Sequence, residues 1–175
     1  NVQRRSQQHA RRMTDPAAGL RIREAVRAVI VDPATRVLLV RFEFPTATRW
    51  ALPGGGLEPN ETHIDALRRE LEEEVGLVDV EIGSQIWHRL HIVPFLNGEF
   101  DGQRERIFFI RSGSFEARPR LSWAQMNAEF VHELRWWTLD EIAASDAHFV
   151  PSGLHRLLTT LLRDGPPTTS IDVSG

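Results

Sequence analysis

Apolar residues in the segment 62–75 recur with the period of an α-helix. At about 100° per residue they fall on one face and form a stripe suited to packing on a sheet; its members are Ile64, Leu67, Leu71 and Val75. Thr62 has the side chain of a helix N-cap, and Asp65 follows at the third position, as in a capping box. Gly76 is suited to end the helix. The sequence therefore predicts an amphipathic helix between Thr62 and Gly76.

Runs rich in β-branched and aromatic residues predict strands on both sides of that helix. Residues 22–31 and 36–44 form two such runs, joined by a turn whose sequence is Asp32-Pro33-Ala34-Thr35. The segment 50–56 is a short strand that enters a glycine-rich loop. Further strands are predicted over 78–82, 85–95, 104–111 and 133–137, and further helices over 139–144, capped by Thr138, and 152–163.

These elements predict one α/β domain, because strands that surround two or more helices build layers around a shared core. We assign it to residues 21–163 of the 175. Residues 1–20 are polar and rich in arginine and glutamine, and are predicted to be a mobile N-terminal extension. Residues 164–175 have no core pattern and are predicted to be a mobile C-terminal tail.

Composition and charge exclude several functional classes. The 21 basic and 24 acidic residues give a net charge of -3, which provides no overall basic field for a stable nucleic-acid partner. Cysteine is absent, so a thiolate nucleophile and a zinc-thiolate site are excluded. No apolar stretch approaches the length of a membrane span, so no membrane partner is predicted and a cytoplasmic location is the default expectation.

Three glutamates of the predicted helix share an arc beside its apolar stripe. Glu70, Glu73 and Glu74 stand at positions i, i+3 and i+4, so their carboxylates converge. Like charges at this spacing repel, and negative charge near the C-terminal end opposes the helix dipole. A cation would offset both effects, and Mg2+ or Mn2+ prefers such oxygen ligands. The alternative is a solvated acidic face paired with arginines.

Residues 55–77, GGLEPNETHIDALRRELEEEVGL, fit the pattern G-x5-E-x7-R-E-U-x-E-E-x-G-U, in which U is aliphatic. This pattern is the Nudix box, so the chain resembles the Nudix hydrolases. The resemblance implies a Nudix-type α/β/α sandwich with a central mixed β-sheet. It also implies Mg2+-dependent hydrolysis of a small molecule, a nucleoside diphosphate linked to another group X, with ADP-ribose-like compounds and nucleoside triphosphates as candidates.

The resemblance also implies roles for the box residues. Glu73 and Glu74 would be metal ligands, and Glu70 would complete the metal set or act as general base. The carbonyl of Gly54, just before the box, would be a further ligand. Arg69 would hold the catalytic glutamates, and Glu61 would pair with it.

In some family members a downstream loop supplies the general base, and here Glu129 and Glu133 lie where such a loop would fall. Pro94 stands 17 residues beyond Leu77, near a proline that relatives acting on ADP-ribose often carry. Further possible substrate contacts are Arg27, Arg41, Arg49 and Trp50.

Two other functional classes are left open by the sequence. One is a catalytically silent Nudix module that binds a nucleotide metabolite as a sensor or regulator. The other is an interaction protein whose acidic helix is only solvated. The oligomeric state is also open, with a homodimer among the possibilities.

Overall fold

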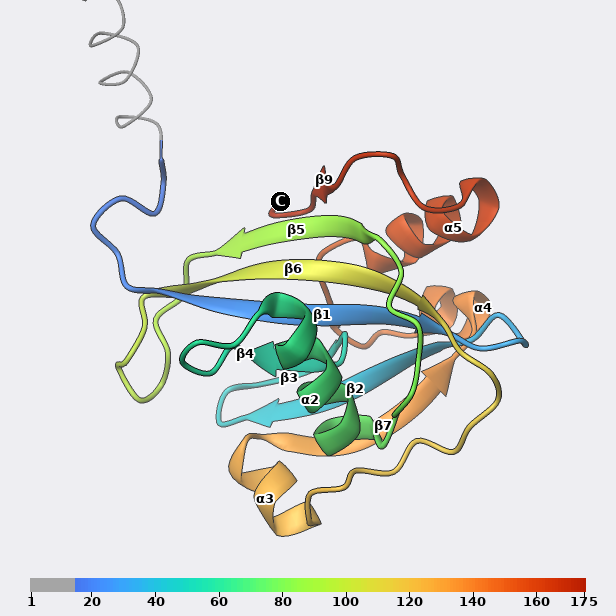
Figure 1. The fold of residues 1–175 in the computed structure, drawn as a ribbon, viewed down its shortest axis with the longest axis horizontal. Helices are drawn as coiled ribbons and strands as arrows, with labels where there is room; N and C mark the ends of the chain where they lie inside the picture. The colour runs from blue at the N-terminus through green and yellow to red at the C-terminus, as the bar shows by residue number, and fades with distance from the viewer. Residues whose placement is uncertain (1–14) are drawn as a thin grey trace, which may run out of the picture.

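The structure is a computed structural model that describes residues 15–175. Most of the predicted N-terminal extension, residues 1–14, lies outside the described residues. The fold is α/β, as predicted, and its sheet is mixed (Figure 1). The strands are β1 (Ile22–Val31), β2 (Val37–Phe44), β3 (Ala47–Ala51), β4 (Gly54–Gly56), β5 (Gln85–His91), β6 (Gly102–Arg111), β7 (Val131–Trp137), β8 (Phe149–Val150) and β9 (Ile171–Asp172). The helices are α2 (His63–Val75), α3 (Trp123–Ala128), α4 (Leu139–Ala144) and α5 (Leu154–Asp164).

The sheet divides between β1 and β2. β1 pairs in parallel with β6 along its whole length. Its antiparallel pairing with β2 is confined to the residue pair Val31 and Val37 at the end of the strand. Away from that pair the two strands separate, and the short strand β4 pairs with β1 instead. Figure 1 shows α2 in front of β4 and of the diverging strands. The glycine segment and the acidic helix therefore lie together where the sheet divides.

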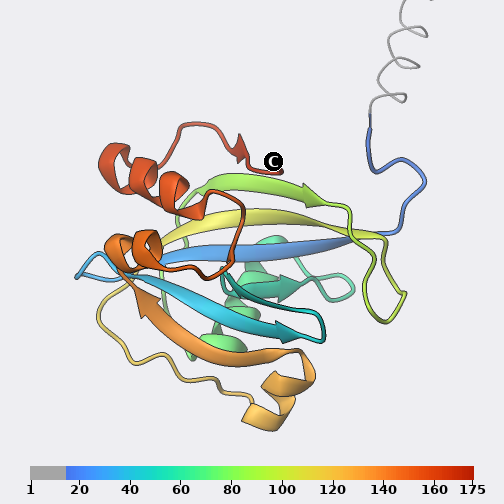
Figure 2. The same ribbon diagram turned by 180° about the vertical axis from the view of Figure 1, so that it is seen from behind.

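Both faces of the sheet are covered. On β1, Val26, Ala28 and Ile30 pack toward α2. Val29 and Val31, on the other face of the strand, pack toward α4 and α5. Figure 2 shows α4 and α5 on the face opposite α2. On β7, Trp136 and Trp137 point to opposite faces, because successive strand side chains alternate, and each packs with the core of its own face.

Several element boundaries differ from the sequence prediction. Residues 78–82 form no strand, although Val80 and Ile82 pack with their side chains against the α2 core. The β-branched content there reflects side-chain burial rather than pairing in the sheet. The segment Gly54–Gly56, predicted as a loop, is strand β4, because its backbone pairs with β1. β5 ends at His91 rather than at residue 95.

The C-terminal segment, which the sequence analysis assigned to a mobile tail, is instead attached to the sheet. Helix α5 continues to Asp164, and β9 pairs in parallel with β5. Val173 is buried, and its backbone N–H donates to the carbonyl of His88 at 2.9 Å. A two-residue strand followed by a single buried residue is too short a pattern to show in the sequence. None of the helices within residues 15–175 has the length and apolar character of a membrane span.

Candidate active site

Helix α2 begins and ends where the sequence predicts. The backbone N–H of Asp65 donates to the Thr62 hydroxyl at 3.1 Å, which caps the first turn. Gly76 ends the helix in the left-handed conformation with φ 72°. Ile64, predicted in the apolar stripe, is 37% exposed, and the residues that α2 buries in the core are Ala66, Leu67, Leu71 and Val75. This packing fixes the rotation of the helix and directs Glu70 and Glu74 toward β4.

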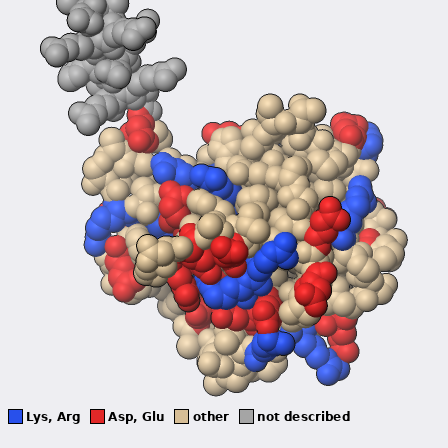
Figure 3. Space-filling view, viewed as in Figure 1, with Lys and Arg blue, Asp and Glu red and all other residues tan. Residues whose placement is uncertain are grey.

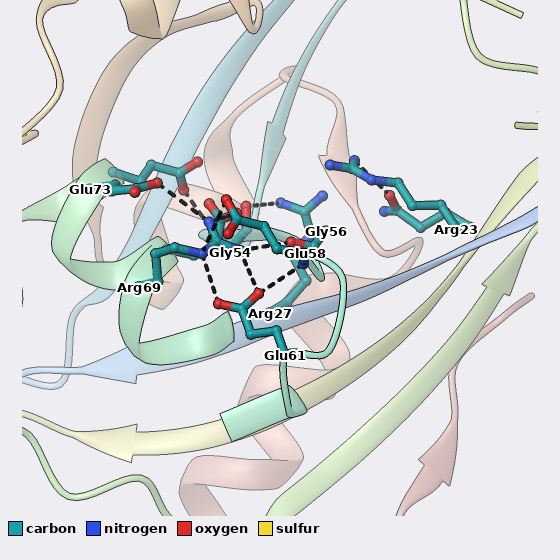
Figure 4. A network of polar contacts seen from close by, with 11 residues as sticks. Arg23, Arg27, Gly54, Gly56, Glu58, Glu61, Arg69 and Glu73 are labelled. Atoms are coloured by element: carbon teal, nitrogen blue, oxygen red, sulfur yellow. Dashed lines mark hydrogen bonds and ion pairs between the residues drawn. The ribbon is translucent and has the colours of Figure 1, made fainter. Parts of the chain in front are cut away.

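The guanidinium of Arg69 connects the parts of this site (Figure 4). Its Nε and Nη2 each donate at 2.8 Å to one carboxylate oxygen of Glu61. Its Nη1 donates to Glu70 at 2.8 Å and to Glu73 at 3.4 Å. Nη2 also donates to the Gly56 carbonyl at 3.0 Å. One arginine therefore ties the segment before α2, strand β4 and two helix glutamates into one arrangement, and its hydrogen bonds lower the pKa of Glu61.

Glu74 is the most buried of the three glutamates, with 5% of its surface exposed. Its Oε1 accepts a hydrogen bond of 3.1 Å from the backbone N–H of Gly54. Burial raises the pKa of Glu74 to about 8, against the opposing influence of the positive charge on Arg27. A carboxylate with this environment is ionised more readily when a cation lies beside it.

Glu70 lies against the backbone of β4. Its side chain is 14% exposed, and a Cβ at Gly55 would overlap its carboxylate. Glycine at position 55 therefore allows the helix and strand to approach this closely. Burial raises the pKa of Glu70, and the hydrogen bond and charge of Arg69 oppose that shift.

The donors at this junction suit Mg2+ or Mn2+ in their chemistry, since both ions prefer carboxylate and carbonyl oxygens. Among residues 15–175, however, no three His, Cys, Asp or Glu side chains are arranged to hold an ion. Arg69 lies between Glu70 and Glu73 and supplies the positive charge that these carboxylates contact. Figure 3 shows acidic and basic side chains gathered on this face of the molecule. Ion binding would exchange arginine contacts for metal–oxygen bonds.

Arg27, a predicted substrate contact, is directed at the backbone beside the box. Its Nη1 donates to the Gly54 carbonyl at 2.8 Å, and its Nε donates to Glu105 at 3.1 Å. Glu105, which was not predicted as a site residue, is buried on β6 and also contacts Arg89 at 3.4 Å. Burial opposes ionisation of Glu105, but the charges of Arg27 and Arg89 outweigh it and lower its pKa. The sequence did offer one signal. Glu105 and the buried Ile107 are two residues apart on β6, so their side chains lie on the same face of the strand.

Two of the predicted substrate contacts have other partners. Trp50 is 6% exposed and packs edge-on against Trp137, with the ring centroids 5.0 Å apart. The Trp50 ring is therefore part of the core, which corrects its prediction as a substrate contact. Arg41 forms ion pairs with Glu43 and, at 2.9 Å, with Glu133. Glu133, one of the two alternative bases, is therefore engaged with an arginine of the neighbouring strand.

Arg49, Pro94 and Glu129 make no described hydrogen bond or ion pair with the box glutamates. Arg49 is half-buried on β3, and Pro94 is exposed in the connection between β5 and β6. Glu129 ends α3 and is exposed. The pKa of Glu74 is raised mainly by burial, and the negative charge of Glu129 raises it further. Glu129 is therefore close enough to the box helix to act on Glu74.

Arg23 is a second residue of this site that the sequence did not predict. Its guanidinium lies against Gly56, where a Cβ would overlap it. Gly56 therefore has Arg23 against its Cα and Arg69 bound to its carbonyl (Figure 4). No signal in the sequence distinguished Arg23 from the other arginines of the chain.

Comparisons with known proteins agree with this architecture. A family model for the NUDIX domain matches residues 21–157. The RNA pyrophosphohydrolase of Acidiphilium cryptum is 33% identical over 137 residues, which cover 73% of this chain and 82% of the relative. The RNA pyrophosphohydrolase of Rickettsia bellii is 30% identical over 127 residues, which cover 69% of this chain and 77% of the relative.

Solved structures show the same fold at low sequence identity. The NUDIX domain of Shewanella oneidensis NrtR, complexed with ADP ribose, matches with a TM-score of 0.62 and 20% identity, over 85% of this chain and 93% of that one. The E. coli ORF135 protein matches with a TM-score of 0.60 and 20% identity, over 89% of this chain and all of that one.

Proposed function

The chain belongs to the NUDIX family of hydrolases, and on that premise we propose that it uses Mg2+, with Mn2+ as a substitute, to cleave the pyrophosphate of a nucleoside diphosphate derivative. The observation that carries this proposal is the meeting of two helix glutamates with strand β4, where Glu74 binds the backbone of Gly54 and Glu70 lies against Gly55. Oxygen donors gather there on a rigid helix and a hydrogen-bonded strand. Such a site suits a divalent cation that accompanies a phosphate.

The residues have distinct parts in the proposed reaction. Glu73, Glu74, Glu70 and the Gly54 carbonyl would hold the ion, which when bound neutralises phosphate charge and lowers the pKa of a water molecule. Arg69 keeps Glu70 and Glu73 in place through the contacts described above. It is a positioning residue in this scheme.

Glu70 is the proposed general base. Its half-buried carboxylate has a pKa raised by burial, which brings the pKa closer to neutral pH, where a base is most effective. Glu129 is the alternative, because it is exposed, its charge acts on Glu74, and its carboxylate has no hydrogen bond or ion pair with a described residue. Glu133 is less suited, since Arg41 binds it at 2.9 Å.

The first substrate to test is a 5′-triphosphorylated RNA. Two relatives at 33% and 30% identity bear the name RNA pyrophosphohydrolase. The net charge of -3 suits an enzyme that holds the phosphorylated end of such a molecule rather than its length, since lengthwise binding needs many basic contacts. Nucleoside triphosphates and ADP-ribose are the comparison substrates.

The test measures phosphate and pyrophosphate release from these three substrates, with Mg2+ and with EDTA. We expect turnover that requires the metal and that falls by about a thousandfold or more in Glu73→Gln and Glu74→Gln, since each removes a charged ligand. Glu72→Gln is the matched control, because Glu72 contacts Arg120 rather than the site. Turnover of no substrate would favour a silent nucleotide-binding module, and full activity in both ligand variants would contradict the proposal.

A further inference from the structure

Strands β1, β6 and β5 carry polar side chains at one end of the face that α4 and α5 cover at the other. Arg27 is two residues from the buried Val29 on β1, and Glu105 is two residues from the buried Ile107 on β6. Because strand residues two apart share a face, Arg27 and Glu105 both belong to the face that α4 and α5 cover. We call the following group the polar sheet face: Arg23, Arg27, Arg89, His91, Gln103 and Glu105. Its members come from three adjacent strands.

The register of the strands arranges this group in rows. Gln103 lies beside Arg23 on one neighbouring strand and beside His91 on the other. Glu105 lies beside Arg89 in the next row. The amide nitrogen of Gln103 donates to Glu105 at 2.8 Å, which joins the two rows.

The positive charges of the polar sheet face exceed its negative charge. Glu105 is its sole carboxylate, and it is already shared by Arg27 and Arg89. The side chain of Arg27 is 13% exposed, that of Glu105 7% and that of Arg89 11%. Their charges are therefore screened only weakly. With Arg23, the polar sheet face has three guanidinium groups and one carboxylate.

The Arg23 guanidinium binds a neutral side chain rather than a carboxylate. Among residues 15–175 no carboxylate forms an ion pair with it, and its one hydrogen bond goes to the neutral side-chain oxygen of Gln103 at 3.3 Å. Its guanidinium also lies over the ring of Phe95, 5.6 Å from the centroid. The side chain is half-buried, and burial together with the charge of Arg27 lowers the pKa of Arg23. The negative charges of Glu70, Glu129 and Glu99 oppose this shift, but none of the three forms an ion pair with the guanidinium. A desolvated charge without a paired counterion is unfavourable, and an anion would relieve it.

We propose that Arg23, supported by Gln103 and the other residues of the polar sheet face, binds a phosphate group of the substrate other than the one held at the box. This inference rests on the proposed hydrolase function. Arginine suits the task because its planar fork binds phosphate with two parallel hydrogen bonds.

The position of Arg23 relative to the box supports this assignment. Gly56 has the Arg23 guanidinium on its Cα side, and its carbonyl is bound by Arg69, which contacts Glu70 and Glu73. One residue of β4 therefore separates the Arg23 guanidinium from the arginine that holds the box glutamates. A polyphosphate chain is long enough to have one phosphate at the box and a neighbouring one at Arg23. The substrate class is thus a nucleotide with at least two linked phosphates, one for the box and one for Arg23.

Binding of inorganic pyrophosphate in EDTA, measured by calorimetry at low salt, tests the subsite without the metal. We expect Arg23→Gln to weaken binding about tenfold or more, because a charge-assisted hydrogen bond is lost, and Arg23→Lys to weaken it less. Arg104→Gln is the matched control. Arg104 lies on β6 next to Gln103 but pairs with Glu24 on the other face, and it is 44% exposed.

Kinetics provide a second readout. In Arg23→Gln we expect the KM for a triphosphate substrate to rise about tenfold while kcat stays within about threefold, because the lost contact binds substrate and transition state alike. An arginine that only packs on Phe95 would leave both the KM and pyrophosphate binding unchanged.

The outcomes separate the subsite from the hydrolase proposal. Arg23-dependent pyrophosphate binding without any hydrolysis would support the subsite and remove the hydrolase function. Hydrolysis that is unaffected by Arg23→Gln would overturn the subsite alone. The subsite is also overturned if the wild type does not bind pyrophosphate in EDTA, or if Arg104→Gln weakens binding as much as Arg23→Gln.

Discussion

Arg27 and Glu74 bind the two backbone polar atoms of the same residue. Arg27 donates to the Gly54 carbonyl at 2.8 Å, and Glu74 accepts from the Gly54 N–H at 3.1 Å. Arg27 belongs to β1 and Glu74 to α2, so this residue joins the sheet to the acidic helix. The backbone before the box is therefore fixed from both sides.

Gly54 cannot be replaced without strain. Its φ of 137° is a conformation that glycine adopts easily and other residues rarely do, and a Cβ would overlap the carbonyl of Val26. We expect Gly54→Ala to lower the free energy of unfolding by at least about 2 kcal/mol, measured by urea denaturation. Gly113→Ala is the control, because a Cβ at Gly113 meets no other atom within 4 Å. Equal stability of the two variants would show that the Gly54 backbone is not constrained.

Gly55→Ala should affect activity more than stability. The added methyl would overlap the Glu70 carboxylate, which is the mobile end of a flexible side chain, so the overlap is relieved by moving Glu70. We expect kcat to fall about tenfold or more, because a general base displaced by even 1 Å loses much of its effect. The unfolding midpoint should change little. A variant with normal kcat would argue against Glu70 as the base.

Arg69→Lys should lose most of the contribution of Arg69 despite keeping the charge. An ammonium cannot reproduce the planar fork that reaches Glu61, Glu70 and the Gly56 carbonyl together. We expect the kcat to fall and the Mg2+ concentration for half-maximal activity to rise, each by about tenfold. Arg68→Lys is the matched control, since Arg68 is exposed and contacts the Val80 carbonyl on the other side of the helix. Wild-type behaviour of Arg69→Lys would reduce Arg69 to a surface ion pair.

The box helix was predictable because its determinants are local. The Thr62 cap, the apolar stripe and the Gly76 stop lie within one short segment, and the structure reproduces the cap, the stop and all of the stripe except Ile64. The spacing of the glutamates within that helix directs Glu70 and Glu74 toward β4. Such signals require no knowledge of which strands pair.

The polar sheet face was not predictable for the opposite reason. Arg23 and Gln103 are adjacent because β1 and β6 pair in parallel, although 80 residues separate them in the chain. The parallel register follows from tertiary packing, and no local pattern encodes it. The same holds for Trp50, whose burial depends on the approach of Trp137 from β7.

The buried carboxyl of Glu74 makes the stability of the metal-free protein depend on pH. Burial raises its pKa from the ordinary value of 4.5 to about 8. Between these values the unfolded chain has released this proton while the folded protein keeps it, so stability falls as pH rises. The contribution of protonated Glu74 to stability is fully present below the unfolded-state pKa of 4.5, and it is lost as the pH rises through the folded-state pKa of about 8.

Thermal unfolding in EDTA between about pH 5 and pH 8 measures this effect, because the window lies between the unfolded and folded pKa. We expect the Tm of the wild type to fall more steeply across it than the Tm of Glu74→Gln, which has no carboxyl to titrate. The comparison isolates Glu74 from the other groups that titrate in the same range. Saturating Mg2+ should reduce the difference, since a cation beside Glu74 favours its ionised form. Parallel slopes for the two proteins in EDTA would show that Glu74 is ionised in the folded protein across the whole range, and that burial does not hold its proton.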